Sequence, residues 1–265
     1  MRNRIPSYFQ LERFDIQPED IVRLGLGCDP RDIQPTVILM PVWNVEIFKD
    51  QVDNVSVIAD RRVYQLEYQG SGVSVIRSGI GAPLAGDVVL ALGCTPCEKL
   101  IFAGSAGGLE KSMKIGDLMI AHKSLSGDGF SRYLTSEVVP TDRYLQPSEP
   151  DATLTEIVEC VAKKHCHHAA IQLHRGTIIS VDSIIGQFLR LEEYVKHYGC
   201  MGIEMETAAV FGAAKVVGIR ACALLQVSDV IPAHKTLFSG RTDEDHKRRR
   251  RIKKEVLTKV LLESI

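Results

Sequence analysis

The sequence predicts an α/β protein, because strand-like runs alternate with helical segments along most of its 265 residues. A continuous apolar run at 36–41 (TVILMP) is typical of a strand buried on both faces of a sheet. The segment 202–229 then joins a strand end, a helix rich in small residues and a second apolar strand, with carboxylates at both of its ends. In open α/β sheets, ligands sit in the crevice at the carboxyl ends of strands, so we expect these carboxylates to share one crevice.

The composition is that of an ordinary globular protein, with 45% hydrophobic and 25% charged residues and a formal net charge of −1. That balance gives no argument for binding nucleic acid or an anionic membrane, and no apolar run reaches the roughly 18 residues of a membrane span. Seven scattered cysteines favour reduced thiols over a disulfide framework. We therefore expect a cytoplasmic protein made of one domain, 1–265, with no membrane or nucleic-acid partner.

In the first part of the chain, residues 1–35 carry four prolines and are predicted to form an N-terminal arm that covers the body or reaches a neighbouring subunit. β-rich runs separated by turn signals then predict three strands after the first one. The glycines of 78–81 precede a proline at a probable first helical position, which predicts a helix there. The predicted strands span 36–41, 55–59, 63–68 and 73–77.

In the rest of the chain, a strand at 99–103 is predicted to end in a glycine-rich turn, GSAGGL at 104–109. Such a turn presents backbone N–H groups that can hold an anion or a sugar hydroxyl. Further strands are predicted at 117–122 and 170–181, a long polar loop at 123–150, and helices at 153–164, 187–198 and 242–264.

Three further motifs are weighed against ordinary structural roles. A lone CxxC at 94–97 has no second pair and is weak evidence for zinc. The HCHH run at 165–168 follows a helix, where cationic residues suit the C-terminal dipole. The basic run 246–254 (HKRRRRIKK) lies on a helix whose apolar stripe continues through it, so we expect a solvated face there rather than a polyanion site. No metal site is predicted.

Four motifs carry a resemblance to a known family: SGIGAP at 78–83, GSAGGL at 104–109, GIEMETAA at 202–209 and VSD at 227–229. In their order and spacing, the chain resembles the nucleoside phosphorylase superfamily, which includes uridine phosphorylase, hexameric purine nucleoside phosphorylase and methylthioadenosine nucleosidase. The resemblance implies a three-layer α/β sandwich around a mixed, partly barrel-like sheet. It also implies cleavage of the N-glycosidic bond of a nucleoside with no metal or organic cofactor.

The resemblance assigns roles residue by residue. Glu206 matches the glutamate that binds the ribose 2′- and 3′-hydroxyls, and Met205 matches the methionine that packs against the sugar. Asp229 matches the general acid of purine-cleaving members, which favours a purine, and Ser228 would orient its carboxyl group. Ser105 matches the family's phosphate- or sugar-contacting hydroxyl, and Gly81 and Gly104 are two further positions expected to bind the substrate.

Each of these acidic residues also has a structural interpretation. A glutamate at a strand–helix junction is often an N-cap or a first-turn acid that the helix dipole favours. That interpretation is the stronger one for Glu204, which the substrate-binding prediction also includes, and the weaker one for Glu206. Asp229, after a buried strand, would by itself also suit a turn cap.

The segments that would hold the acceptor depart from the family. Where phosphorylases carry a Gly-Asp-Pro-x-Arg type loop, this chain has PVWNVE at 41–46, and Phe102 replaces a second phosphate-binding arginine. Losing two guanidinium groups weakens phosphate binding. Glu46 falls where the nucleosidases keep the glutamate that activates water. Water is therefore slightly favoured as the acceptor, with phosphate as a possible co-substrate.

Several arginines favour phosphate as the acceptor instead. Arg62 matches the arginine that a neighbouring subunit lends to the phosphate, and Arg23 stands where uridine phosphorylases place a neighbour-donated histidine. Arg241 is placed where hexameric purine phosphorylases have an arginine that assists the catalytic aspartate. The resemblance thus implies a homo-oligomer (dimer, trimer or hexamer) with sites completed at subunit interfaces.

The residues expected around the base do not identify which base the protein binds. Ile184 stands where relatives carry an aromatic residue that stacks on the base. Gln187 resembles the glutamine that uridine phosphorylases direct at uracil, although the start of a surface helix explains it equally well. Three hypotheses follow: a purine-leaning nucleosidase, a purine or uridine phosphorylase, and a nucleoside-binding protein without catalysis.

Overall fold

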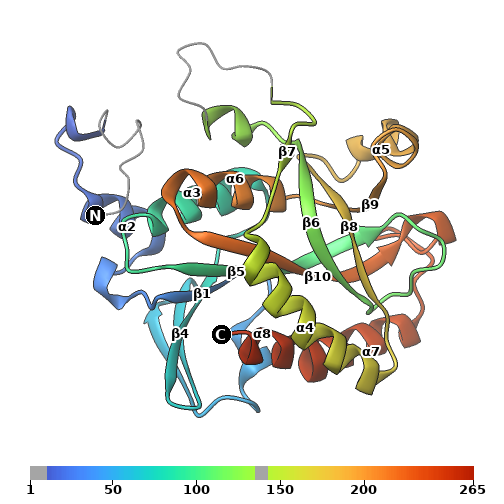
Figure 1. Ribbon diagram of the computed structural model, residues 1–265, viewed down its shortest axis with the longest axis horizontal. Coiled ribbons are helices and arrows are strands. Elements are labelled where there is room, and N and C mark those ends of the chain that lie inside the picture. The colour runs from blue at the N-terminus through green and yellow to red at the C-terminus, as the bar shows by residue number, and fades with distance from the viewer. Residues whose placement is uncertain (1–10, 135–142) are drawn as a thin grey trace.

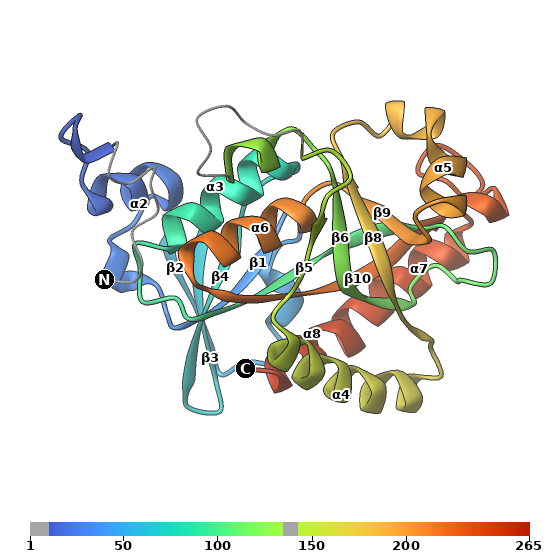
Figure 2. The ribbon, with the colours of Figure 1, turned by 45° about the horizontal axis from the view of Figure 1, so that its top comes forward.

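The computed structural model describes residues 11–134 and 143–265 and has three layers (Figure 1). Helices α3 (Ala82–Leu92) and α6 (Thr207–Val217) cover one face of the sheet. Helix α4 (Ala152–Ala169) and the C-terminal helix cover the other face, as the tilted view of Figure 2 also shows. The predicted three-layer α/β sandwich is confirmed.

The central sheet is mixed and partly closed. Strands β5, β10, β6, β8 and β9 pair in a ring, since β10 pairs with both β6 and β5 and β9 pairs with β5. β1 continues the sheet from β5, followed by β4, β3 and β2. The predicted barrel-like part is thus confirmed. The strand bounds are β1 Thr36–Met40, β2 Asn54–Ala59, β3 Val63–Tyr68, β4 Ser71–Arg77, β5 Lys99–Gly108, β6 Leu118–Gly127, β7 Pro147–Ser148, β8 Leu173–Val181, β9 Cys200–Glu204 and β10 Arg220–Val230.

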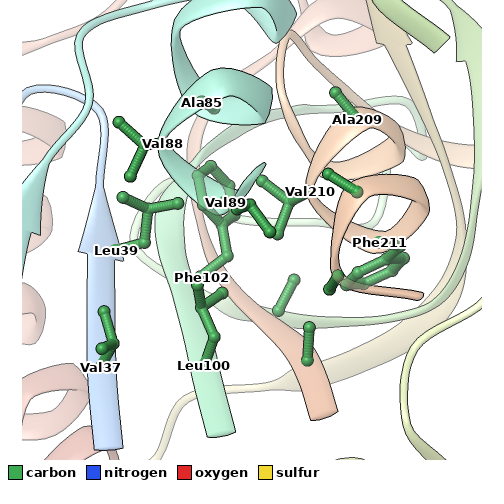
Figure 3. Close-up of a cluster of buried hydrophobic side chains, with 14 of the residues drawn as sticks. Val37, Leu39, Ala85, Val88, Val89, Leu100, Phe102, Ala209, Val210 and Phe211 are labelled. Atoms are coloured by element: carbon green, nitrogen blue, oxygen red, sulfur yellow. The ribbon is translucent and has the colours of Figure 1, made fainter. Parts of the chain in front are cut away.

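The core on the α3–α6 side is packed from apolar residues of both helices and of the strands beneath them. Figure 3 shows Phe102 of β5 below Val89 of α3 and Val210 of α6. All three side chains are fully buried. Burying a side chain of this kind stabilises a fold by about 1.5–3 kcal/mol. Phe102, which stands at a family arginine position, therefore contributes to packing in this chain.

The glycine-rich segment 104–109 differs from its prediction. It is not a turn, because residues 104–108 belong to β5. The strand continues because both of its edges find partners: β10 along residues 99–108 and β9 at Gly107 and Gly108. Glycine has a low intrinsic preference for strands, so only this pairing explains the extended backbone.

The described part of the predicted N-terminal arm contains a helix, α2 (Pro18–Leu26), which lies beside α3 in Figure 1. Pro18 opens the helix, and Gln17 and Asp20 form a capping box. Gly27 ends it with a φ of 77°, a left-handed conformation that suits glycine. Val22 and Leu26 are fully buried, so this part of the arm packs onto the body. Residues 1–10 of the predicted arm and 135–142 of the predicted loop lie outside the described residues.

The predicted C-terminal helix is present as α7 (Asp243–Ile252), a π-helical turn (Lys253–Leu257) and α8 (Thr258–Glu263). Thr242 and Asp245 form a capping box at its start. Six apolar residues are buried along it: Ile252, Val256, Leu257, Val260, Leu261 and Leu262. A short helix, α5 (Leu191–Lys196), lies in the predicted 187–198 segment. None of the helices in the described ranges is long and apolar enough to cross a membrane.

Candidate active site

The candidate site lies where β9, β5 and β10 run side by side. Gly107 of β5 pairs with Ile203 of β9 on one edge and with Asp229 of β10 on the other. A Cβ atom at Gly107 would lie 3.1 Å from both Asp229 Oδ2 and Ile203 Cγ2. The absence of a side chain therefore lets the Asp229 carboxyl group lie over the backbone of β5. This is the role of the glycine-rich segment in the folded chain.

A cleft of about 190 Å³ opens over this part of the sheet. Its walls are mainly apolar, with Trp43, Ile80, Ile184 and Leu237 among them. An apolar pocket with a few convergent polar groups is the usual form of a small-molecule site. The cleft brings together eight of the predicted site residues: Gly104, Ser105, Gln187, Glu204, Met205, Glu206, Ser228 and Asp229.

Glu204 and Glu206, at the end of β9, have different surroundings. Glu204 accepts hydrogen bonds from the backbone N–H groups of Glu206 and Thr207 (2.8 Å each) and from the Ser180 hydroxyl. The two N–H groups lie at the start of α6, at its N-cap residue Glu206 and at its first residue Thr207, so Glu204 satisfies donors at the helix N-terminus, in line with its structural interpretation. Burial raises the pKa of Glu204, and its hydrogen bonds oppose that rise.

Glu206 has one carboxylate oxygen engaged, since the Gly81 backbone N–H donates to Oε1 at 2.7 Å. Gly81 itself is not among the residues that line the cleft, but it holds Glu206 in place. Burial, followed by the charge of Glu204, raises the pKa of Glu206 to about 8. The proton of this pair therefore lies on Glu206, because Glu204 already accepts three hydrogen bonds that favour its ionised form.

Asp229 owes its position to a β-bulge in β10. Val227 pairs with Ala106 and Asp229 pairs with Gly107, which leaves Ser228 as the extra residue. Without the bulge, the side chains of Ser228 and Asp229 would alternate between the two faces. Here both line the cleft, and Ser228 Oγ donates to Asp229 Oδ1 at 2.6 Å. Burial raises the pKa of Asp229, while Ser228, Arg241 and Arg249 oppose that rise.

The lining of the cleft includes a charged residue that the sequence did not identify as part of the site, Arg249 of α7. It lines the cleft, and its Nη2 donates to Ser105 Oγ at 3.0 Å. The prediction of a solvated face for 246–254 is therefore wrong at Arg249. It is also wrong at Arg248, which binds the Ile115 carbonyl and the Asp117 carboxylate. Neither position matches a family motif. The only indication in the sequence was where each residue of the basic run falls around the helix relative to the apolar stripe.

The other predicted site residues lie outside the cleft lining in this single chain. Glu46 is exposed on a 3-10 turn, Val45–Phe48, and Arg23 is exposed at the end of α2. Arg62 follows β2 and is half-buried. Arg241 lies close enough to Asp229 for its charge to affect the pKa of that carboxyl group, and its Nη2 donates to the Leu237 carbonyl. The roles of these four residues stay predictions.

Within the ranges that the structure describes, no group of three or more His, Cys, Asp and Glu side chains is arranged to hold a metal ion. The HCHH run, predicted to follow a helix, forms the last turns of α4, and His165 pairs with Glu263 at 2.9 Å.

Comparison with known proteins agrees with this geometry. The model of a family described as the phosphorylase superfamily matches residues 37–265. The chain belongs to the phosphorylase superfamily. The resemblance found in the four motifs is confirmed, and the chain is an enzyme of the nucleoside phosphorylase and nucleosidase type.

Relatives of both types occur in this superfamily. A guanosine phosphorylase from Halorubrum lacusprofundi is 28% identical over 208 residues, covering 76% of this chain and 80% of that protein. The structure of uridine phosphorylase from Vibrio fischeri superposes with a TM-score of 0.73 and 21% identity, covering 89% of this chain and 94% of the other. AMP nucleosidase from Bacteroides thetaiotaomicron gives a TM-score of 0.65 and 20% identity, covering 80% and 88%. Both structural likenesses establish the fold.

Proposed function

We propose that this enzyme cleaves the N-glycosidic bond of a purine-type nucleoside in the cleft between β9, β5 and β10. The observation that carries the proposal is the pairing of two buried carboxyl groups in one cleft. Glu206 faces it from the start of α6 and Asp229 faces it from the bulge of β10. The name of the guanosine phosphorylase relative supports a purine as the leaving base.

In the proposed reaction, the oxygen of the Glu206 carboxyl group that Gly81 leaves available forms hydrogen bonds with the ribose hydroxyls. Asp229 acts as the general acid and donates a proton to a nitrogen of the leaving base, and the burial that raises its pKa favours the protonated form. The C1′–N bond breaks and its electron pair leaves with the base, while an oxygen of the acceptor forms a new bond to C1′. Met205 and the apolar walls exclude water around the sugar and the base.

The acceptor is the finer part of the proposal. The sequence slightly favoured water because the phosphate-binding arginines are altered and because of Glu46, but in this chain Glu46 is exposed and away from the cleft lining. Arg249 beside Ser105 instead supports an anionic acceptor. We further propose a homo-oligomer, which the resemblance to the family supports. We also propose that it acts in a reducing compartment such as the cytoplasm, which its seven scattered thiols support.

The test is release of free base from a panel of purine and pyrimidine nucleosides, with and without phosphate. We expect wild-type protein to release purines, and we expect Asp229→Asn to lower that rate by about 10² to 10⁴, the usual contribution of a general acid. Nucleoside binding by Asp229→Asn, followed by the shift in melting temperature, should change little. Asp243→Asn, an exposed change at the start of α7, is the matched control.

Two results would contradict the proposal. The first is a wild-type protein that binds nucleosides but releases no base from any of them, which is the outcome expected of a binding protein without catalysis. The second is an Asp229→Asn variant that cleaves at the wild-type rate, which would remove the proposed acid from the reaction.

A further inference from the structure

Positive charge is concentrated near one of the three carboxyl groups that line the cleft, that of Asp229. Arg249 and Arg241 both lie near Asp229, and each lowers the pKa of that carboxyl group. The charge of Arg241 also lowers the pKa of Arg249, after the larger effect of burial. Two guanidinium groups thus lie near the Asp229 carboxyl group, and such a local concentration of positive charge attracts an anion.

The side chain of Arg249 is only partly satisfied by the protein. Its Nη2 donates to Ser105 Oγ, but its Nε is buried and has no hydrogen-bond partner. A buried donor without a partner destabilises the protein, so a ligand that accepts a hydrogen bond from it is bound more tightly. A guanidinium fork suits two oxygens of a tetrahedral oxyanion, since its donors lie in one plane at a fixed spacing.

Three contacts fix Arg249 in this position. Arg248, its neighbour, pairs with the buried Asp117 at 2.9 Å. The Arg249 carbonyl accepts from Gln226 Nε2 at 3.0 Å, and Gln226 lies opposite Ser105 in the register of β10 and β5. One turn later, Lys253 Nζ lies 4.8 Å above the ring of Trp43, which lines the cleft. Helix α7 is therefore anchored at the point where it enters the site.

We propose that Arg249, together with Ser105, forms an oxyanion subsite for a phosphate group, supplied by the C-terminal helix in place of the arginines absent from 41–46 and from position 102. The subsite lies beside the cleft that would hold the ribose, and so this inference rests on the proposed function. The phosphate has two possible sources: inorganic phosphate as the acceptor, or a phosphate group carried by the substrate.

Binding and cleavage are measured separately, so that the two proposals fail in different ways. Binding to the full chain is followed by calorimetry and by the shift in melting temperature, which rises with ligand concentration relative to Kd. The two probes are inorganic phosphate with nucleoside present, and a purine nucleoside 5′-monophosphate without phosphate. Arg249→Gln should weaken binding of the responding probe by about 10- to 100-fold, the range for charged hydrogen bonds.

The controls separate the subsite from the fold. Arg250→Gln changes the next, exposed residue of the same helix and should bind like the wild type. Ser105→Ala keeps Arg249 but removes its hydroxyl partner, and a several-fold loss of binding is expected even if Arg249→Gln proves unstable. A response to inorganic phosphate identifies a phosphorolytic acceptor site. A response to the 5′-monophosphate alone identifies a nucleotide substrate, and either result supports the subsite.

The inference is overturned if neither probe binds to the wild type, or if Arg249→Gln and Ser105→Ala bind both probes as the wild type does. In that case, continued release of base from nucleosides would leave the proposed function intact. A wild-type protein that binds phosphate but releases no base from nucleosides would contradict the proposed function and leave the subsite in place.

Discussion

At the scale of single residues, the site depends on how the environment divides protons between similar groups. Glu204 and Glu206 are two positions apart and both are buried, but their hydrogen bonds differ. Three donors hold Glu204 as a carboxylate at the start of α6, whereas Glu206 accepts one from Gly81 and keeps the proton. One glutamate therefore serves the helix, and the other remains available for a ligand.

This division predicts how stability depends on pH in the ligand-free protein. The pKa of Glu206 is about 8 in the folded chain, against an ordinary value of 4.5. Between these two pH values the folded state holds a proton that the unfolded state has lost, so the free energy of unfolding falls as pH rises. We expect a loss on the order of a few kcal/mol between pH 5 and 8.5, measured by urea denaturation.

The matched variants identify the group responsible. Glu206→Gln should flatten most of the pH dependence, and Asp229 accounts for a remainder of the same sign because burial raises its pKa as well. Glu192→Gln, on the exposed surface of α5, should leave the slope unchanged. A slope that survives in Glu206→Gln would contradict this assignment of the proton.

At the scale of elements, the sequence predicted what depends on local patterns. Continuous apolar runs gave strands at β1 and β10, and the motif around Glu206 placed both carboxylates in one cleft. The course of β5 was not predictable, because its glycines favour a turn and only pairing with two neighbours extends them. Arg249 was not predictable for a related reason. The direction of its side chain depends on how α7 is rotated about its own axis as it packs against the sheet. Contacts with residues far away in the sequence determine that rotation.

The bare backbone of β5 predicts an effect on activity that exceeds the effect on stability. An alanine at Gly107 would place its Cβ 3.1 Å from Asp229 Oδ2, so the carboxyl group must shift by a few tenths of an ångström. Misplacing a catalytic group by about 1 Å costs up to 10²-fold, so Gly107→Ala should lower kcat by about 10- to 100-fold. The melting temperature should change by only a few degrees, because overpacking of this size costs about 1 kcal/mol.

The control for this prediction is Gly72→Ala in β4. Its Cβ would also meet neighbours closely, at 3.0 Å from Gln34 Oε1, but these are the flexible ends of glutamine side chains. A small change in melting temperature with unchanged kcat is expected. Equal kcat losses in both variants would show that the effect of Gly107→Ala comes from the sheet and not from Asp229.

At the scale of the whole molecule, the arginines considered for the site fall into two groups. Arg249 lines the cleft of its own chain and Arg241 lies near Asp229, while Arg62 and Arg23 lie outside the lining. The resemblance to the superfamily implies that arginines of the second group complete the site of a neighbouring copy. Both lie on the β2–α2 side of the molecule, which the two ribbon views place away from α7.

This arrangement predicts complementation between two impaired variants. Arg62→Gln would damage the site of the neighbour, and Asp229→Asn would damage the site of its own chain. In a mixed oligomer, some sites combine the intact Asp229 of one chain with the intact Arg62 of the other. Co-expressing the two variants should therefore restore about a quarter of the wild-type activity in a dimer assembled at random, since each site then draws its two residues independently from equal pools. A mixture no more active than the sum of the separate variants would place Arg62 outside the neighbour's site, because a residue that acts only within its own chain cannot be supplied by a partner.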